Sequence, residues 1–243
     1  MVIIPIQPSN FALEKTTIWS FKERGSWATH TGGYRGNWSP YVPRNLILRY
    51  TKPGEWVLDQ FMGSGTTLVE AKLLNRNAIG LDINENAVAL ANKKLQFSFD
   101  SVSQVFIRQA DAANLAVIKN NSIDFICTHP PYADIIKYSH NLPKDISCLS
   151  LNDFLNRIPV VAKEAYRVLK PGHYCAIMMG DIRRKGQVVP LGFEVMKRFL
   201  KQGFCSQEII IKEQRNCRSE AFWRGRSLNF LLLAHEYIFV FKK

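Results

Sequence analysis

The stretch VLDQFMGSGTT, residues 57–67, decides the fold of this chain. An apolar strand pattern runs into Gly-Ser-Gly, and a helical pattern begins directly after the second glycine. Glycines allow the backbone to approach a ligand closely, and the first turn of a helix offers free N–H groups. The stretch lacks the Gly-Lys-Ser/Thr of a phosphate-binding loop and the third glycine of the dinucleotide fingerprint. It therefore predicts a loop for a different cofactor.

Acidic residues mark the ends of three successive predicted strands, at Asp59, Asp82 and Asp111. Because parallel strands end at one edge of a sheet, we expect these three acids to line one crevice, with Asp82 placed for a ribose 2′-OH. A ligand with ribose hydroxyls, an adenine amine and an amino-acid ammonium fits this set, and S-adenosylmethionine has all three groups. The alternative is a tight turn with solvated or helix-capping acids, which the register of the acids disfavours.

Short apolar segments alternate with helical patterns along the chain. The predicted strands are 56–61, 78–83, 105–109, 123–128, 174–179, 208–212 and 237–241, and the predicted helices are 66–75, 85–97, 151–169 and 192–202. Strands that are apolar throughout are covered on both faces, so the pattern predicts an α/β, Rossmann-like fold. We expect a seven-stranded, mostly parallel sheet between helices, ending in an antiparallel C-terminal hairpin.

Composition excludes several classes of protein. The 243 residues are 47% hydrophobic and 21% charged, which is typical of a globular domain. No apolar stretch reaches the length of a membrane span, and no secretory signal is recognisable. The five cysteines lack CxxC spacing, so we expect neither a disulfide framework nor a metal cluster, and we expect a cytoplasmic location.

Positive charge is concentrated in two flanks of the chain, whose net charge is +12. Residues 53–182 hold 12 basic and 13 acidic residues, residues 15–52 hold 7 and 1, and residues 183–226 hold 11 and 4. Aromatic residues interleave both flanks. Cations neutralise phosphates and aromatic rings stack on bases, so the pattern favours a nucleic-acid partner. A solvated basic surface without a partner is the alternative.

A second motif, Thr128-His129-Pro130-Pro131-Tyr132, follows the fourth predicted strand. Two prolines end the backbone hydrogen bonding of the strand and stiffen the chain. Tyr132 then presents a flat ring at the carboxyl edge of the sheet. Taken alone, the motif slightly favours a rigid turn with a packed tyrosine over a binding role.

Together the two motifs resemble those of the S-adenosylmethionine-dependent amino-methyltransferases of DNA, which make N4-methylcytosine or N6-methyladenine. The resemblance covers roughly residues 35–243 and rests on 59–67 and 128–132, with further similar stretches at 38–43, 164–172, 180–181 and 235–241. It implies a class I methyltransferase fold, S-adenosyl-L-methionine as cofactor and double-stranded DNA as partner. It implies no metal and no membrane association.

The resemblance also implies roles for the matching residues. The implied cofactor-binding residues are Asp59, Phe61, Gly63, Ser64, Gly65, Thr66, Asp82, Ile83, Asp111, Pro40 and Tyr41. The implied catalytic residues, which hold the target base, are His129, Pro130, Pro131 and Tyr132. His129 is a departure, because the family usually has Asp, Asn or Ser at that position.

The chemistry requires activation of an exocyclic amine, whose lone pair is delocalised into the base. We expect the Pro130 carbonyl to accept one amine N–H and a neutral His129 ring nitrogen to accept the other, while Tyr132 stacks on the flipped base. In the alternative, His129 points elsewhere and the carbonyl acts alone. An unperturbed histidine predicts that activity falls as the pH drops through about 6.5.

The non-acidic residue 129 favours cytosine N4 over adenine N6 as the target. An RNA methyltransferase, a glutamine-N5 protein methyltransferase and a DNA-contacting subunit without activity are further alternatives. We expect residues 1–52 to form a basic, aromatic segment that contributes cofactor and DNA contacts, and residues 53–243 to form the catalytic domain. The predicted DNA-binding residues are Arg35, Arg183, Arg184, Arg218, Arg224 and Arg226. A cognate restriction endonuclease is a possible partner, and a monomer and a homodimer both remain open.

Overall fold

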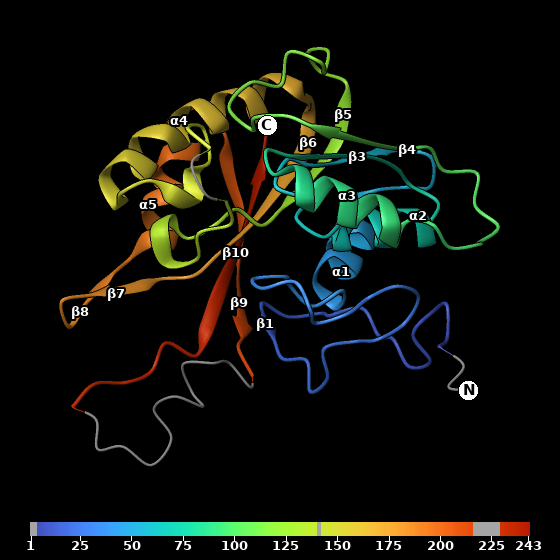
Figure 1. Cartoon of the computed structure of the whole chain (residues 1–243), viewed down its shortest axis with the longest axis horizontal. Helices are drawn as coiled ribbons and strands as arrows, with labels where there is room; N and C mark the ends of the chain where they lie inside the picture. Colours follow the sequence, from blue (N-terminus) through green and yellow to red (C-terminus); the bar gives the residue numbers. More distant parts are fainter. Residues whose placement is uncertain (1–3, 140–141, 216–228) are drawn as a thin grey trace.

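A computed structural model describes residues 4–139, 142–215 and 229–243 (Figure 1). Its strands are β1 (Ile18–Trp19), β2 (Trp56–Asp59), β3 (Asn77–Asp82), β4 (Val105–Gln109), β5 (Ile123–Thr128), β6 (Leu169–Met179), β7 (Ile182–Arg184), β8 (Gln187–Val189), β9 (Cys205–Glu213) and β10 (His235–Lys242). Its helices are α1 (Tyr41–Tyr50), α2 (Thr66–Leu73), α3 (Glu85–Lys94), α4 (Leu151–Val168) and α5 (Leu191–Leu200), with short 3-10 turns η1 (Ala133–Ile135) and η2 (Ile146–Cys148). Among the described residues, no helix is long and apolar enough to span a membrane.

The main sheet has the strand order β1-β9-β10-β6-β5-β2-β3-β4. The five strands from β2 to β6 are parallel, whereas β10 lies between β6 and β9 and is antiparallel to both. The predicted α/β fold and its antiparallel C-terminal hairpin are therefore confirmed. An eighth strand, β1, adds to the edge parallel to β9 through two residue pairs. A two-residue strand carries no periodic pattern, so the sequence did not predict it.

Helices cover both faces of this sheet, with α4 and α5 on one side and α1, α2 and α3 on the other (Figure 1). Strand β10 shows how the sequence directs this packing. Phe239 and Phe241 pack in the cluster under α4 and α5, whereas Ile238 and Val240 pack in the cluster under α1 and α2. Successive side chains of a strand point to opposite faces, so a strand apolar throughout needs two covering layers.

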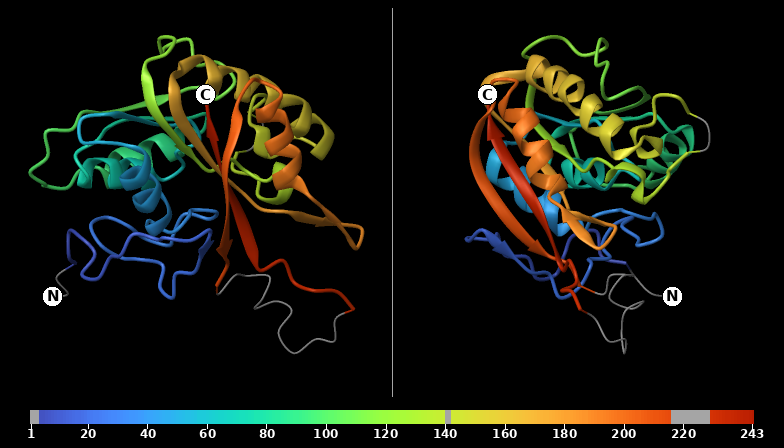
Figure 2. Two further views of the ribbon diagram at one scale, coloured as in Figure 1. Left: turned by 180° about the vertical axis from the view of Figure 1, so that it is seen from behind. Right: turned by 90° about the vertical axis from the view of Figure 1, so that its left-hand side faces the viewer.

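A buried carboxylate fastens the N-terminal segment to α2. Glu70 accepts hydrogen bonds from Trp27 Nε1 at 2.7 Å and from Arg44 Nη1 at 2.8 Å, and it lies 2.6 Å from His30 Nε2. The N-terminal segment, blue in Figure 2, runs along one end of the molecule beneath the helices. These contacts hold it against the strand ends that form the site described next.

Candidate active site

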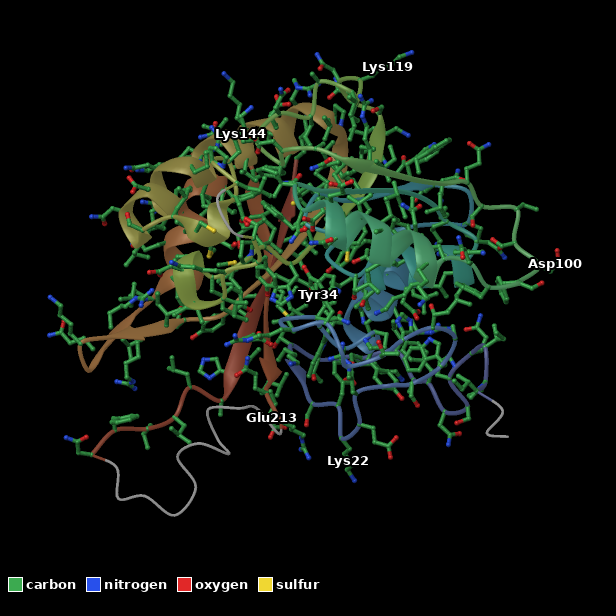
Figure 3. The ribbon with its side chains drawn as sticks, in the orientation of Figure 1. Lys22, Tyr34, Asp100, Lys119, Lys144 and Glu213 are labelled. Carbon is green, nitrogen blue, oxygen red and sulfur yellow. The ribbon has the colours of Figure 1, made fainter. Side chains whose placement is uncertain are left out.

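A cleft of about 760 Å³ opens where the glycine loop, the strand ends and the N-terminal segment meet. The predicted site residues that line it are Arg35, Asp59, Phe61, Gly63, Ser64, Asp82, Ile83, Asp111, His129, Pro130, Pro131 and Tyr132. Tyr34, which also lines the cleft, lies in the middle of the molecule in Figure 3. The structure thus brings both sequence motifs into one cleft at the carboxyl ends of parallel strands.

The glycine loop has the geometry that its residues allow. Gly63 and Gly65 both have a left-handed backbone, with φ of 50° and 81°. The Gly63 N–H donates to the Asp82 carboxylate over 2.9 Å. A Cβ atom at Gly63 would lie 3.1 Å from the Tyr34 ring. Backbone conformation and close approach therefore both favour glycine at this position.

Asp59 is buried at the end of β2 and is held by three donors. Its carboxylate accepts hydrogen bonds from Thr67 Oγ1 at 2.5 Å, Thr128 Oγ1 at 2.7 Å and the Phe61 N–H at 3.1 Å. Burial raises the pKa of Asp59 to about 6, and the three hydrogen bonds oppose that rise. A carboxylate has about four lone-pair sites, so one remains for a ligand.

The other two predicted acids differ in how their charge is compensated. Asp82 accepts from the backbone N–H groups of Gly63 and Asn84, and burial raises its pKa. Asp111 pairs instead with Arg157 of α4 at 2.7 Å. Among the described residues, neither Asp59 nor Asp82 has a cationic partner within ion-pair distance. These two carboxylates therefore favour a ligand that brings hydroxyl donors or a positive charge.

Gln60 provides a further test of what the cleft can hold. Its side chain is 1% exposed, it borders the cleft, and its amide nitrogen and oxygen have no hydrogen-bond partner among the described residues. Buried polar groups in native proteins almost always have a partner, so a ligand or an ordered water is expected there. The cleft volume and these polar groups fit S-adenosylmethionine in size and in donor chemistry.

Four predicted cofactor residues do not line the cleft. Pro40 and Tyr41 lie behind it, where the Tyr41 ring stacks on Phe21 at a centroid distance of 5.2 Å. Residues 37–39 line the cleft in their place. Gly65 and Thr66 begin α2 behind the loop. Within the similar stretch 38–43, the cleft is thus lined by Trp38 and Ser39 and not by Pro40 and Tyr41.

His129 and Tyr132 are joined in a chain of polar contacts at the cleft wall. The His129 ring stacks on Trp38 at 5.4 Å, and its Nε2 lies 2.9 Å from Tyr132 Oη. Tyr132 Oη donates to Glu236 at 2.7 Å, and Lys212 Nζ lies 3.0 Å from the other Glu236 oxygen. Pro130 is buried beside them, and its carbonyl accepts no hydrogen bond from any described residue.

The surroundings of His129 change the pH behaviour expected of it. Burial lowers the pKa of His129 to about 4; the Lys212 ammonium acts in the same direction and the Glu236 carboxylate opposes it. The prediction of a transition near 6.5 assumed an unperturbed ring, whereas this ring is half-buried and stacks on Trp38. The imidazole is neutral at physiological pH, as an acceptor role requires.

Three residues of this wall were not found from the sequence: Trp38, Lys212 and Glu236. Trp38 lies within a stretch that the sequence analysis singled out, but its partner on β5 was not apparent. Glu236 did leave a signal, because it lies in the similar stretch 235–241, directly before the predicted strand 237–241, and a buried carboxylate seldom lacks a functional or paired role. Only the placement of β10 beside β6 shows that it faces Tyr132.

The predicted DNA-binding arginines have different surroundings. Arg35 is exposed at the cleft. Arg183 donates to the carbonyls of Gly186 and Leu231, and Arg184 pairs with Asp134. The remaining three lie outside the described residues: Arg218, Arg224 and Arg226.

A group of possible metal ligands lies at the opposite edge of the sheet, where β2 and β5 begin. It consists of Glu55, Asp124 and His173. Lys170 Nζ lies 2.5 Å from Asp124 and already supplies a positive charge there. The group is therefore explained by an ion pair.

The arrangement of sheet and helices is similar to that of solved structures, among them an S-adenosylmethionine-dependent methyltransferase. TrmN from Thermus thermophilus aligns with a TM-score of 0.60 and 22% identity, over 86% of this chain and 50% of that one. An S-adenosylmethionine-dependent methyltransferase from Methanosarcina mazei aligns with a TM-score of 0.58 and 17% identity, over 82% and 96%. These likenesses define the fold of the protein.

The family follows from sequence. The DNA methylase family of N6/N4 methyltransferases matches residues 8–93 and 123–243, so the chain belongs to this family, whose cofactor is S-adenosylmethionine.

Two curated relatives illustrate the range of the similarity. The type II methyltransferase M2.DpnII of Streptococcus pneumoniae is 45% identical over 56 residues, 23% of this chain and 21% of its own. The tRNA (guanine(10)-N2)-dimethyltransferase of Pyrococcus abyssi is 27% identical over 164 residues, 67% and 45%. In these two comparisons the chain spans less than half the length of the relative.

Proposed function

We propose that this protein transfers a methyl group from S-adenosylmethionine to the N4 amine of a cytosine flipped out of double-stranded DNA. The observation that carries the proposal is the shared cleft. It brings the glycine loop and two carboxylates without cationic partners next to the wall made by His129 and Pro130. Family membership supports DNA as the substrate, and the net charge of +12 supports a polyanionic partner.

The cofactor half of the cleft is assigned to three residues. Asp82 is suited to ribose hydroxyls, Asp59 to the ammonium group, and Gly63 to close backbone approach. When bound, S-adenosylmethionine supplies an electrophilic methyl group on a sulfonium centre. The remaining work, which is to hold and activate the amine, falls to side chains and backbone of this chain.

The base half of the cleft offers two acceptors for the two amine hydrogens. The Pro130 carbonyl and the His129 Nδ1 atom accept no hydrogen bond from any described residue. Accepting both N–H groups localises the nitrogen lone pair for attack. Proximity and orientation in such a site contribute roughly 7–11 kcal/mol in well-aligned cases. Tyr132, with its hydroxyl bound to Glu236, presents its ring to the base.

Cytosine N4 is proposed over adenine N6 because residue 129 carries no acidic group. The proposed DNA contacts are Arg35 at the cleft and the arginines of the β7–β8 hairpin and of the segment that follows β9. A tRNA substrate is the second candidate, because the relative from Pyrococcus abyssi that aligns over 164 residues is named for tRNA.

A transfer assay with methyl-labelled cofactor decides among these substrates. Label is expected in double-stranded DNA and, after digestion to nucleosides, in N4-methyldeoxycytidine. Label in N6-methyldeoxyadenosine would mean that the target base is adenine and would leave DNA as the substrate. Label confined to tRNA would replace the proposed substrate, and no label in either nucleic acid would overturn the proposed function.

The pH dependence of turnover follows from the pKa of His129. With cofactor and DNA saturating, kcat is expected to stay flat between pH 8 and pH 5 and to fall only as the pH approaches 4, because a neutral ring is needed as acceptor. A pH-rate profile checks this. A fall centred near pH 6.5 would contradict the lowered pKa of His129.

Replacing Asp59 with Asn is expected to stabilise the free protein and weaken cofactor binding. The raised pKa of Asp59 means that its ionisation opposes folding, so stability is lost as the pH rises from about 4 through about 6. At pH 8, Asp59→Asn is expected to raise the free energy of unfolding by about 1–3 kcal/mol. Urea unfolding at pH 8 and pH 4 measures the gain, which is expected to shrink at pH 4.

Calorimetric titration of the same variant with S-adenosylhomocysteine is expected to show weaker binding, because an amide cannot offset an ammonium group. A variant that binds the cofactor product as tightly as the wild type would exclude the role assigned to Asp59. Glu55→Gln, at the opposite edge of the sheet, is the matched control and is expected to bind normally.

A further inference from the structure

The Lys212–Glu236 pair is unusual for two adjacent strands, because it lies at the cleft wall and is nearly buried. Glu236 is 6% exposed, and each of its two carboxylate oxygens has a different partner. One oxygen accepts from Lys212 Nζ at 3.0 Å and the other accepts from Tyr132 Oη at 2.7 Å. Neither residue belongs to the two main motifs, 59–67 and 128–132, although Glu236 lies in the similar stretch 235–241.

The directions of the hydrogen bonds that link Glu236, Tyr132 and His129 follow from which of their atoms carry a proton. Burial raises the pKa of Glu236, but the Lys212 ammonium and other contacts bring it below its ordinary value, so the carboxylate only accepts. Burial and the Glu236 carboxylate keep the pKa of Tyr132 well above its usual range. Tyr132 therefore donates its single hydroxyl proton to Glu236, and its oxygen can only accept from His129 Nε2.

A neutral imidazole carries one proton, so a proton on Nε2 leaves Nδ1 with a free lone pair. His129 Nδ1 makes no hydrogen bond to any described residue. We propose that Lys212 and Glu236 are positioning residues, which act through Tyr132 to fix the His129 tautomer that leaves Nδ1 as an acceptor for the substrate amine. The role of Nδ1 rests on the proposed function, whereas the tautomer itself does not.

The tautomer is measured directly by long-range ¹H–¹⁵N correlation spectra of the full-length protein labelled at histidine nitrogens. The chain has five histidines, and His129→Phe identifies the signals of residue 129 by their loss. The wild type is expected to show a protonated Nε2 and a bare Nδ1. A wild-type spectrum with the proton on Nδ1 would overturn the proposal without any variant of Glu236.

Glu236→Leu removes the acceptor for the tyrosine hydroxyl. Tyr132 is then expected to donate to Nε2, which moves the His129 proton to Nδ1 and reverses the two nitrogen signals. We expect kcat to fall about 10–100-fold, as is typical when the partner that orients a histidine is lost, with little change in cofactor affinity. Unchanged histidine signals in a folded variant would overturn the proposal.

Glu208→Leu is the matched control, because this acid on the neighbouring strand β9 bonds Tyr50 and does not line the cleft. This variant is expected to show the wild-type nitrogen signals of His129 and the wild-type kcat. Should the wild type show the expected tautomer but methylate no nucleic acid, the proposed function fails while the fixed tautomer stands. The spectra and the transfer assay therefore test the two proposals separately.

Discussion

Glu70→Gln is expected to lower the free energy of unfolding by about 3–5 kcal/mol, the cost of leaving a buried charge without its partner. Arg44 is 7% exposed and its ion pair with Glu70 spans 2.8 Å. The same carboxylate accepts from Trp27 and contacts His30, so one substitution disturbs three attachments of the N-terminal segment. Urea unfolding followed by circular dichroism measures the loss.

Glu194→Gln is the control for this prediction. Glu194 pairs with Lys197 and Arg198 at 2.8 Å each, but these contacts lie on the surface of α5. Surface ion pairs contribute about 0–1 kcal/mol, so the expected loss is several times smaller. Equal losses for the two variants would show that Glu70 does not fasten the N-terminal segment.

The attachment matters for the site as well as for stability. Trp38, which stacks on His129, belongs to the segment that Glu70 holds. Weakening the attachment is therefore expected to disturb the cleft wall before the sheet unfolds. Of this segment, residues 32–39 line the cleft, whereas Pro40 and Tyr41 do not.

The fold was predictable because its signals are local. Strands such as Ile123–Thr128 are apolar on both faces, and each requires two covering layers wherever it lies in the sheet. The edge strand β1 gave no such signal, because its two residues become a strand only by pairing with Ile211 and Lys212, far away in sequence.

The site, like the fold, has residues that local sequence patterns predict and residues that they do not. Asp59, Gly63 and Asp82 lie at strand ends or in the loop that follows, so alternation of strands and helices was enough to bring them together. The contact of Tyr132 with Glu236 depends on the insertion of β10 between β6 and β9, which no local pattern encodes. The lowered pKa of His129 depends on burial, which no local pattern encodes either.

His129→Phe is expected to lower kcat by about 10²–10³-fold, the usual cost of removing one preorganised polar contact to a reacting group. Phenylalanine keeps a flat ring that can still stack on Trp38, so the cleft wall is retained while Nδ1 is lost. Substrate affinity is expected to change little, because the acceptor acts on the amine as its lone pair localises. Single-turnover transfer to DNA, with cofactor saturating, measures the chemical step.

His129→Asn separates the loss of the acceptor from the loss of the ring. Its side-chain oxygen can accept from the amine, so partial recovery of kcat over the phenylalanine variant is expected. If His129→Phe instead keeps kcat within about threefold of the wild type, far short of the loss expected for such a contact, His129 is not an acceptor. The Pro130 carbonyl, which accepts no hydrogen bond from the described residues, would then activate the amine alone.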